Sequence, residues 1–390
     1  MLPKGLAFPV VSWAKGAILF AMESSGICHM GIARVLPTIA LVGVMVLVVA
    51  PVVVAFRGMR SKPEFLAPSS NSPNNSGVGS ETETAAPAEG QGATSTKKGS
   101  QAAKVTKLVG FDGDRAYEYL VDQVKIGTRI SGTEGNRTLR KRMAEHFAGQ
   151  GAKVTLQKFE VRHPLNGEPV EMENVVASWN ADRPRRVVIG AHFDTRPRAD
   201  KEPTAKKRAE PFYGANDGGS GIAVLMELAN LMQDIKTSVG VDLVAFDGEE
   251  LVWDENGDVA GEYFHGSKHF AEQYRNARGP VPYVAGFVVD MVGGEPLRIY
   301  PDKEGNRRAG HLVQEIWAIA RRLKATGFKT GQFYDVSDDH WPLLEVGIPA
   351  IDIIDFSYKH WHLTSDTADK CSAASLAQVG GVVAEWLRGK

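Results

Sequence analysis

The sequence predicts that residues 106–390 form an α/β domain in which helices cover both faces of a mostly parallel sheet. Short apolar runs, typical of buried strands, alternate there with longer segments whose apolar residues recur at helical spacing. Polar residues collect where the apolar runs end, and ligands bind parallel sheets outside the carboxyl ends of their strands. A chain of 390 residues with 43% hydrophobic content is also long enough to bury a core.

The first half of the domain contains both kinds of pattern. Amphipathic spacing predicts helices over 114–127 and 135–151, and the second ends in a glycine. Alternating residues predict strands over 153–161 and 174–180. The run 185–194 is continuously apolar until its C-terminal end, which predicts a buried strand.

The second half repeats these patterns. A turn rich in Gly and Ser opens a helix over 220–235. The apolar runs 241–250 and 283–293 predict buried strands with acidic residues at their C-terminal ends. The remaining elements are a helix over 311–325, a strand over 348–356 and a closing helix over 375–388.

An apolar segment lies in the N-terminal region 1–62. Residues 35–56 carry no charged side chain, and at about 1.5 Å per residue they are long enough to cross about 30 Å of hydrocarbon. We expect a membrane anchor rather than a buried core helix, and a cleaved signal peptide is the alternative interpretation. The flanking basic residues are too evenly split to decide an orientation.

A low-complexity linker separates this segment from the domain. Residues 63–105 are rich in Ser, Asn, Gly, Thr, Ala and Pro, and cannot bury enough apolar surface to offset the entropy of ordering. We therefore expect a flexible tether that holds a catalytic domain outside the cytoplasmic membrane. The oligomeric state stays open.

Composition excludes several classes of function. Lys and Arg number 45 against 46 Asp and Glu, so the chain lacks the basic excess of a general nucleic-acid binder. Two cysteines exclude a disulfide scaffold and a cysteine-rich zinc module. Any metal ion must therefore be bound by His, Asp and Glu.

Six candidate metal or catalytic residues follow apolar strands or lie in glycine-rich turns and late loops: His192, Asp217, Glu249, Glu250, Asp290 and His362. Each alone has a structural interpretation, such as a turn, a helix cap or a solvated surface. Asp290 directly follows an apolar Phe-Val-Val run, so its carboxylate needs a partner. Their joint occurrence at strand ends predicts a metal site, and His and carboxylate ligands suit zinc.

The spacings have mechanical reasons. His192 and Asp194 are two residues apart, so on a strand one can bind the metal while the other orients a ligand. Asp217 lies in a glycine-rich turn, where little side-chain bulk blocks an ion. Glu249 and Glu250 are adjacent and point apart in extended geometry, so one can bind metal while the other acts as general acid or base.

These residues resemble those of the zinc aminopeptidase superfamily with a phosphorylase/hydrolase-like fold. The motifs are AHFDT, GANDGGSG, FDGEE and VVDMVG, with the late His362. Within the superfamily, three stretches look like the glutaminyl-peptide cyclotransferases: 265–273, 337–354 and 360–372. The resemblance covers roughly residues 110–390 and implies a three-layer αβα sandwich with a mostly parallel, mixed sheet.

The resemblance also implies roles. Asp217, Glu250 and His362 match the ligands of a single zinc ion, and Glu249 matches a proton-shuttling acid. The further matches are Asp290 and Asp338 as acids of a hydrogen-bond network, and Trp361 and Trp253 as aromatic walls of the substrate pocket. In the two-zinc aminopeptidases, His192 and Asp290 complete a second site, so ligand identity leaves one or two ions open.

The implied reaction is zinc-dependent cyclisation of an N-terminal glutaminyl residue of a peptide or protein to pyroglutamate, with release of ammonia. An aminopeptidase of the same fold is the first alternative, and a catalytically silent, membrane-tethered ectodomain is the second. The charged stretch 195–211 interrupts the motifs, and we expect a plain solvated surface loop there rather than a role in specificity.

Overall fold

The computed structural model describes residues 105–390 except 256, 278 and 280. Within those residues, no helix has the length and apolar character needed to cross a bilayer. The predicted membrane segment 35–56 and all but the last residue of the predicted linker 63–105 lie outside the described residues.

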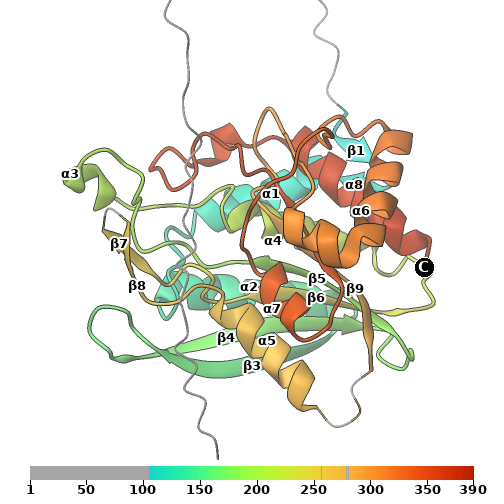
Figure 1. The fold of residues 1–390 in the computed structure, drawn as a ribbon, viewed down its shortest axis with the longest axis horizontal. Coiled ribbons are helices and arrows are strands. Elements are labelled where there is room, and N and C mark those ends of the chain that lie inside the picture. The colour runs from blue at the N-terminus through green and yellow to red at the C-terminus, as the bar shows by residue number, and fades with distance from the viewer. Residues whose placement is uncertain (1–104, 256, 278, 280) are drawn as a thin grey trace, which may run out of the picture. The chain divides into compact units, whose positions relative to one another are not determined.

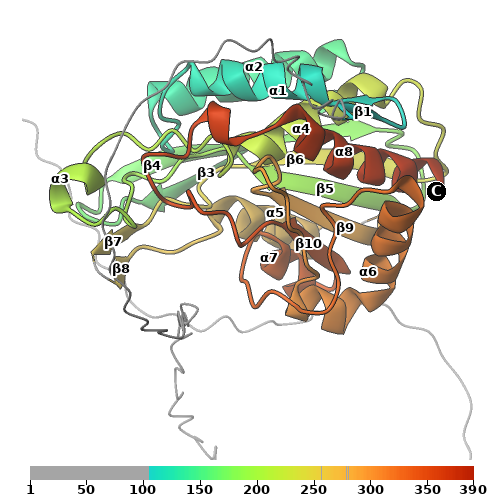
Figure 2. The same cartoon turned by 90° about the horizontal axis from the view of Figure 1, so that it is seen from above.

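A six-stranded mixed sheet forms the centre of the domain, in the order β10-β9-β5-β6-β4-β3. Figure 1 labels the strands β3, β4, β5, β6 and β9 of this sheet, and Figure 2 adds the edge strand β10. The four strands β10, β9, β5 and β6 are parallel, whereas β4 runs antiparallel to both β6 and β3. The strand bounds are Lys153–Arg162 (β3), Pro169–Trp179 (β4), Arg186–His192 (β5), Gly240–Phe246 (β6), Tyr283–Asp290 (β9) and Ala350–Ile354 (β10). The predicted α/β architecture with a mostly parallel, mixed sheet is confirmed.

Helices cover both faces of the sheet, as Figure 2 shows. One face carries α1 (Gly113–Val124), α2 (Glu134–Gly149), α4 (Gly219–Leu231) and α8 (Ala373–Arg388). The other carries α5 (His265–Asn276) and α7 (His340–Glu345), and α6 (Lys303–Leu323) packs against α8 and the edge strand β10. The short elements are β1 (Lys107–Leu108), β2 (Phe111–Asp112), α3 (Ala205–Arg208), β7 (Trp253–Glu255), β8 (Asp258–Ala260) and a 3₁₀ turn (Ala368–Lys370).

The hydrophobic core explains the central position of α4. Nearly every residue of this helix is buried, because it lies between the sheet and the outer helices α1 and α8. Gly221 makes this approach possible: a Cβ there would lie 2.8 Å from the Cβ of Ala191 and far inside van der Waals contact with the carbonyl oxygen of Val289. The turn at 217–221 is therefore pressed against the ends of β5 and β9.

Three predicted strands end earlier than expected, and this positions the site. The strands predicted over 185–194, 241–250 and 283–293 end at His192, Phe246 and Asp290. The polar residues that follow belong to loops, whose backbone is free to turn side chains towards a common point. Helix α6 also begins earlier than predicted, because the side chain of Asp302 caps it.

Candidate active site and metal centre

The candidate residues meet at the carboxyl ends of the parallel strands. His192 ends β5 and Asp290 ends β9, while Glu249 and Glu250 follow β6. Asp217 immediately precedes α4, and His362 lies in the loop after β10. The elements come from distant parts of the chain, but their neighbouring places in the sheet bring these ends together.

Asp217, Glu250 and His362 form the first cluster of ligand atoms. All three are buried, and one nitrogen or oxygen from each lies within 4.8 Å of the others. His362 Nε2 is 3.0 Å from Glu250 Oε1 and 3.7 Å from Asp217 Oδ2. The Asp217 Oδ2 atom is buried without a hydrogen-bond partner, as expected for an oxygen that binds a cation. The cluster therefore fits a divalent metal ion.

A second cluster shares Asp217. His192 Nε2 lies 3.3 Å from Asp217 Oδ1 and 3.2 Å from Asp290 Oδ1, and the three ligand atoms again fall within 4.8 Å of one another. Asp217 presents one oxygen to each cluster, so it can bridge two ions. Both the one-ion and the two-ion geometry are thus present.

Buried carboxylates fix the backbone of these ligands. Asp194 accepts hydrogen bonds from the backbone N–H groups of Glu249 and Glu250, both at 3.0 Å. Asp366 accepts them from Asn216 at 2.9 Å and from Asp217 at 3.1 Å. Asp194 thus ties the Glu249–Glu250 loop to the end of β5, and Asp366 ties the Asp217 turn to the loop that carries His362. Both contacts hold the ligand loops in place before metal binds.

The expectation of a solvated loop over 195–211 is wrong for its first half. The side chain of Arg196 is 1% exposed, and its Nη1 and backbone N–H donate to the two carboxylate oxygens of Glu250 at 3.0 and 3.1 Å. Its Nε donates to Asp200, and Asp200 Oδ1 lies 3.0 Å from His362 Nδ1. Arg196 and Asp200 thus connect the metal-ligand candidates Glu250 and His362, and we call this pair the Arg–Asp clamp.

Sequence reasoning missed this clamp because charged residues in a loop usually lie in water. One local signal was available: Arg196 and Asp200 follow directly on the AHFDT motif, close to the strand end that carries His192. Only the fold shows that the chain turns back over the cluster there. Exposed residues such as Lys206 and Lys207 still match the original expectation.

Burial and charge perturb the titration of the site. Burial raises the pKa of Asp217 to about 7, and the nearby Glu250 carboxylate adds to the rise. Burial also acts on Glu250, but His362 and Arg196 outweigh it and lower the pKa of this carboxyl to about 2. The Glu250 carboxylate is therefore ionised, and a bound cation would favour the ionised form of the Asp217 carboxyl.

The Glu249 carboxyl lies beside His192, whereas that of Glu250 lies beside His362. Glu249 Oε2 lies 3.9 Å from His192 Nδ1, and burial raises the pKa of Glu249 well above the ordinary value. Burial and the neighbouring Asp290 raise the pKa of Asp338 to about 6. Raised pKa values stabilise the protonated forms of both carboxyls, and acids with perturbed pKa values beside a metal cluster are typical of general acid–base catalysis.

The two predicted substrate-pocket tryptophans lie close in sequence to metal-ligand candidates, Trp361 on a loop and Trp253 in a short strand. The ring of Trp361 lies 4.2 Å, centroid to centroid, from the imidazole of His362. Trp253 begins β7, three residues after Glu250, and its Nε1 donates to Glu255 at 3.3 Å. His362 itself has a φ of 56°, a left-handed conformation that is uncommon for residues other than glycine and costs of order 1–3 kcal/mol.

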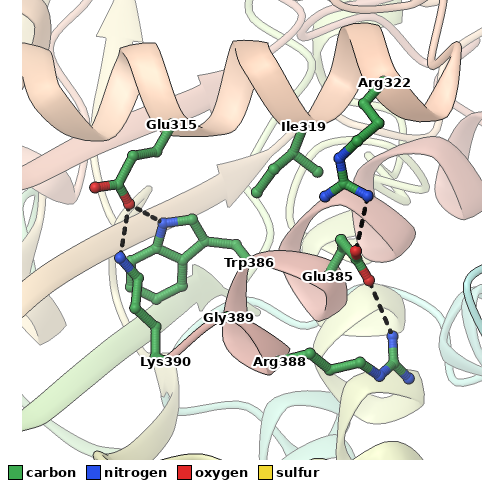
Figure 3. A pocket seen from close by; sticks show the side chains of 8 residues that line it. All are labelled: Glu315, Ile319, Arg322, Glu385, Trp386, Arg388, Gly389 and Lys390. Carbon is green, nitrogen blue, oxygen red and sulfur yellow. Dashed lines mark hydrogen bonds and ion pairs between the residues drawn. The ribbon is translucent and has the colours of Figure 1, made fainter.

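A separate cavity of about 360 Å³ lies between α6 and the end of α8 (Figure 3). Its charged side chains pair with one another: Glu315 with Lys390, and Arg322 with Glu385. None of the candidate metal or catalytic residues lines it. Its chemistry therefore offers no alternative to the buried clusters.

Comparisons with known proteins agree with this geometry. A solved glutaminyl cyclase from Fimbriiglobus ruber is 40% identical, with a TM-score of 0.70 over 74% of this chain and 99% of that one. A leucine aminopeptidase precursor from Bacteroides thetaiotaomicron is 28% identical, with a TM-score of 0.67 over 72% and 98%. A curated bovine relative, a glutaminyl-peptide cyclotransferase-like protein, is 22% identical over 73% of this chain and 78% of its own length.

The model of one protein family, Peptidase family M28, matches residues 174–387, which is more than half of the chain. The match begins in β4 and ends in α8, so it includes both clusters of ligand atoms, Glu249 and the Arg–Asp clamp. The chain belongs to peptidase family M28.

Proposed function

We propose that the protein is a zinc-dependent glutaminyl-peptide cyclotransferase, which converts an N-terminal glutaminyl residue to pyroglutamate and releases ammonia. The observation that carries the proposal is the buried cluster of Asp217, Glu250 and His362 beside an acid, Glu249, whose pKa is raised by burial. The similarity to the cyclase from Fimbriiglobus ruber supports it.

Asp217, Glu250 and His362 would hold one zinc ion, and the Arg–Asp clamp would keep Glu250 and His362 in place. When bound, zinc supplies Lewis-acid polarisation of the substrate's γ-carboxamide. Burial of all three side chains excludes bulk water and strengthens electrostatic interactions within the site.

Glu249 moves the proton. The α-amine nitrogen attacks the γ-carboxamide carbon, forming the ring C–N bond, and Glu249 accepts a proton from that nitrogen. Glu249 then donates this proton to the amide nitrogen, the bond from the carbon to that nitrogen breaks, and ammonia leaves. Nucleophile and carbonyl belong to one residue, so little entropy is lost in bringing them together.

Asp290 and Asp338 orient the reacting groups, and Trp361 gives the side chain an apolar wall. Asp338 Oδ2 is buried without a hydrogen-bond partner, which leaves it available for a substrate nitrogen. The ring of Trp361 beside His362 restricts water at the reacting carbon.

Incubation of the protein with a Gln-peptide and a Leu-peptide tests the proposal, with ammonia and free amino acid measured. We expect ammonia from the first and no cleavage of the second. The Glu249→Gln variant should lose turnover while it keeps its zinc, because Glu249 is outside the first cluster. Near wild-type turnover in that variant refutes the role of Glu249.

An M28 aminopeptidase is the second candidate, and the cluster of His192, Asp217 and Asp290 favours it. With two ions bound, Glu249 would act as base for hydrolysis of the first peptide bond. Release of free leucine, together with two zinc ions per chain, would establish this alternative. A protein that binds no zinc at neutral pH would instead support the non-catalytic ectodomain.

We also propose that residues 35–56 anchor the domain to a membrane, on its outer side, through the tether 63–105. The support is the absence of charge over 35–56 and the polar composition of 63–105. Protease treatment of intact cells should release or digest the domain. A domain that survives such treatment, but is digested after lysis, contradicts the outward orientation.

A further inference from the structure

Two cations of the 195–211 loop lie over the two tryptophans beside the metal cluster. The guanidinium carbon of Arg198 is 4.8 Å from the ring centroid of Trp253, and Lys201 Nζ is 5.1 Å from that of Trp361. Arg198 and Lys201 are three residues apart, so their Cα atoms lie within about 11 Å of each other. One short segment, Arg198–Lys201, therefore spans the space between the two aromatic rings.

This segment is attached to the metal-ligand loop rather than detached in solvent. The backbone N–H of Lys201 donates to the carbonyl oxygen of His362 at 3.3 Å. The carboxylate of the next residue, Glu202, accepts from the backbone N–H of Thr364. At the other end of the loop, α3 lies at the same edge of the domain as the β7–β8 hairpin, which begins with Trp253 (Figures 1 and 2). Lys201 is exposed and tied to the loop of the buried ligand candidate His362, so its ammonium stands at the rim of the site.

The acids of the segment do not neutralise Lys201. Asp200 faces inward to Arg196 and His362, and Glu202 accepts from Thr364 and pairs with Lys207 at 3.8 Å. Lys201 is exposed, and it forms no ion pair within the described part of the chain. Its ammonium is held over the ring of Trp361, with a free charge.

Arg198 is only partly neutralised. Its side chain is 9% exposed, its Nη1 pairs with Glu255, and its Nε is buried without a hydrogen-bond partner. The Glu255 side chain is 49% exposed, so water weakens this ion pair. The rim thus carries an exposed, unpaired ammonium and a largely buried guanidinium whose ion-pair partner, Glu255, is open to water.

The interior of the site has the opposite charge. Glu249, Asp290 and Asp338 are buried acids, and they would face the α-amine of an N-terminal residue. Positive charge at the rim and negative charge inside match a substrate whose amine is followed at short range by a carboxylate. Lys201 Nζ lies 5.1 Å from the ring centroid of Trp361, and that centroid lies 4.2 Å from the centroid of the His362 imidazole. One peptide residue extends the chain by about 3.3–3.6 Å, so the side chain of the residue after the glutaminyl residue is within reach of this ammonium.

We infer that the site selects substrates with a carboxylate one residue beyond the N-terminal glutaminyl residue, and that Lys201 and Arg198 recognise it. This inference rests on the proposed cyclase function. The carboxylate can belong to an Asp or Glu side chain or to the C-terminus of a dipeptide, because both offer the same charge at that distance. Lys201 is a specificity-determining residue in this account and takes no part in the chemistry.

Cyclisation kinetics of three tripeptide amides test the inference: Gln-Glu-Ala, Gln-Gln-Ala and Gln-Lys-Ala. An exposed ion pair contributes up to about fivefold, so KM for the Glu peptide should be about fivefold lower than for the Gln peptide at low salt. The kcat values should agree, because the contact is equal in ground and transition states. At 0.5 M salt the KM difference should shrink to less than about twofold. Gln-Ala as free acid and as amide shows whether a C-terminal carboxylate serves equally.

Three variants separate the inference from a general effect of charge. Lys201→Gln should remove most of the preference for the Glu peptide. Glu255→Gln should increase it, because Arg198 loses its competing carboxylate while the amide oxygen can still accept from Trp253. Lys206→Gln removes an exposed charge from the same loop and is the matched control, with an unchanged preference.

The outcomes distinguish the two proposals. Equal KM values for all three peptides, or a preference that Lys201→Gln leaves intact, would overturn the inference while the cyclase function stands. If no peptide releases ammonia, the cyclase function fails. In that case, the KM values for release of the first residue from Leu-Glu-Ala and Leu-Gln-Ala amides decide the inference separately, since the rim would meet the same second residue.

Discussion

Substitution of Asp200 by Asn tests whether the Arg–Asp clamp positions the metal ligands. Asp200 Oδ1 lies 3.0 Å from His362 Nδ1 and accepts from Arg196 Nε at 2.7 Å. An Asn side chain has the same shape and keeps one acceptor oxygen, but it loses the charge. A hydrogen bond to a charged group contributes about 1.5–3 kcal/mol and a neutral one about 0.5–1.5 kcal/mol, so the loss should be about 1–2 kcal/mol.

If this loss falls on the zinc-bound state, zinc affinity should drop by about 5- to 30-fold, since about 1.4 kcal/mol corresponds to a factor of ten. Competition with a chelator of known zinc affinity measures the dissociation constant directly. The measurement belongs at pH 8. Burial and Arg196 lower the pKa of His362, but Glu250 and Asp200 outweigh them and raise it. At lower pH, protons would therefore compete with zinc for the His362 imidazole.

The control is Asp234→Asn, which removes an exposed carboxylate. Unfolding of the zinc-free proteins by urea shows whether the Asp200 variant is folded. A folded Asp200→Asn protein whose zinc dissociation constant lies within twofold of wild type would refute the positioning role of Asp200.

Three further predictions concern other parts of the domain. Burial raises the pKa of Asp217 to about 7, and this carboxyl must lose its proton when zinc binds, so zinc affinity should rise up to about tenfold per pH unit between pH 5 and 7. Chelator competition at several pH values checks this, and an affinity that does not change with pH contradicts it. Burial alone would raise the pKa of Asp302, but His340 and backbone donors outweigh it and lower this pKa. The ionised Asp302 carboxylate therefore stabilises the fold above about pH 4, and this contribution is lost as the pH falls through the folded-state pKa. Urea unfolding should therefore show a smaller loss of stability between pH 5 and pH 3 for Asp302→Asn than for wild type, and equal losses would count against the argument. Gly221→Ala should lower the free energy of unfolding by about 1–3 kcal/mol because its Cβ has no space beside β5 and β9, whereas Gly149→Ala, where nothing lies within 4 Å, should not destabilise the protein.

The fold could be predicted from the sequence where burial dictates residue type. Strands β5 and β6 are buried along their whole length and β9 along most of it, so their sequences are nearly continuous apolar runs. Helix α5 was missed because its buried face has one large apolar residue, Phe270, beside the small Gly266, Ser267 and Ala271, and α7 because it is only six residues long. The antiparallel strand β4 was placed too late by five residues, since its first half has mixed burial.

The candidate site divides in the same way. His192, Asp217, Glu250 and Asp290 follow apolar runs or open a helix, so the order of the motifs pointed to them, and the structure brings them together with His362. Arg196 and Asp200 could not be predicted, because their burial depends on a loop that folds back over residues more than 50 positions away. Tertiary contacts of this kind leave no local periodicity in the sequence.

The most direct measurement is an anomalous difference map from crystals of the protein grown with zinc, collected on both sides of the zinc absorption edge. We predict a peak about 2.0–2.2 Å from ligand atoms of Asp217, Glu250 and His362, the distances expected for zinc with carboxylate oxygen and imidazole nitrogen. A second peak at His192, Asp217 and Asp290 would favour the aminopeptidase alternative. A map with zinc bound only elsewhere, and none at Asp217, Glu250 and His362, would contradict the metal site on which the proposed chemistry depends.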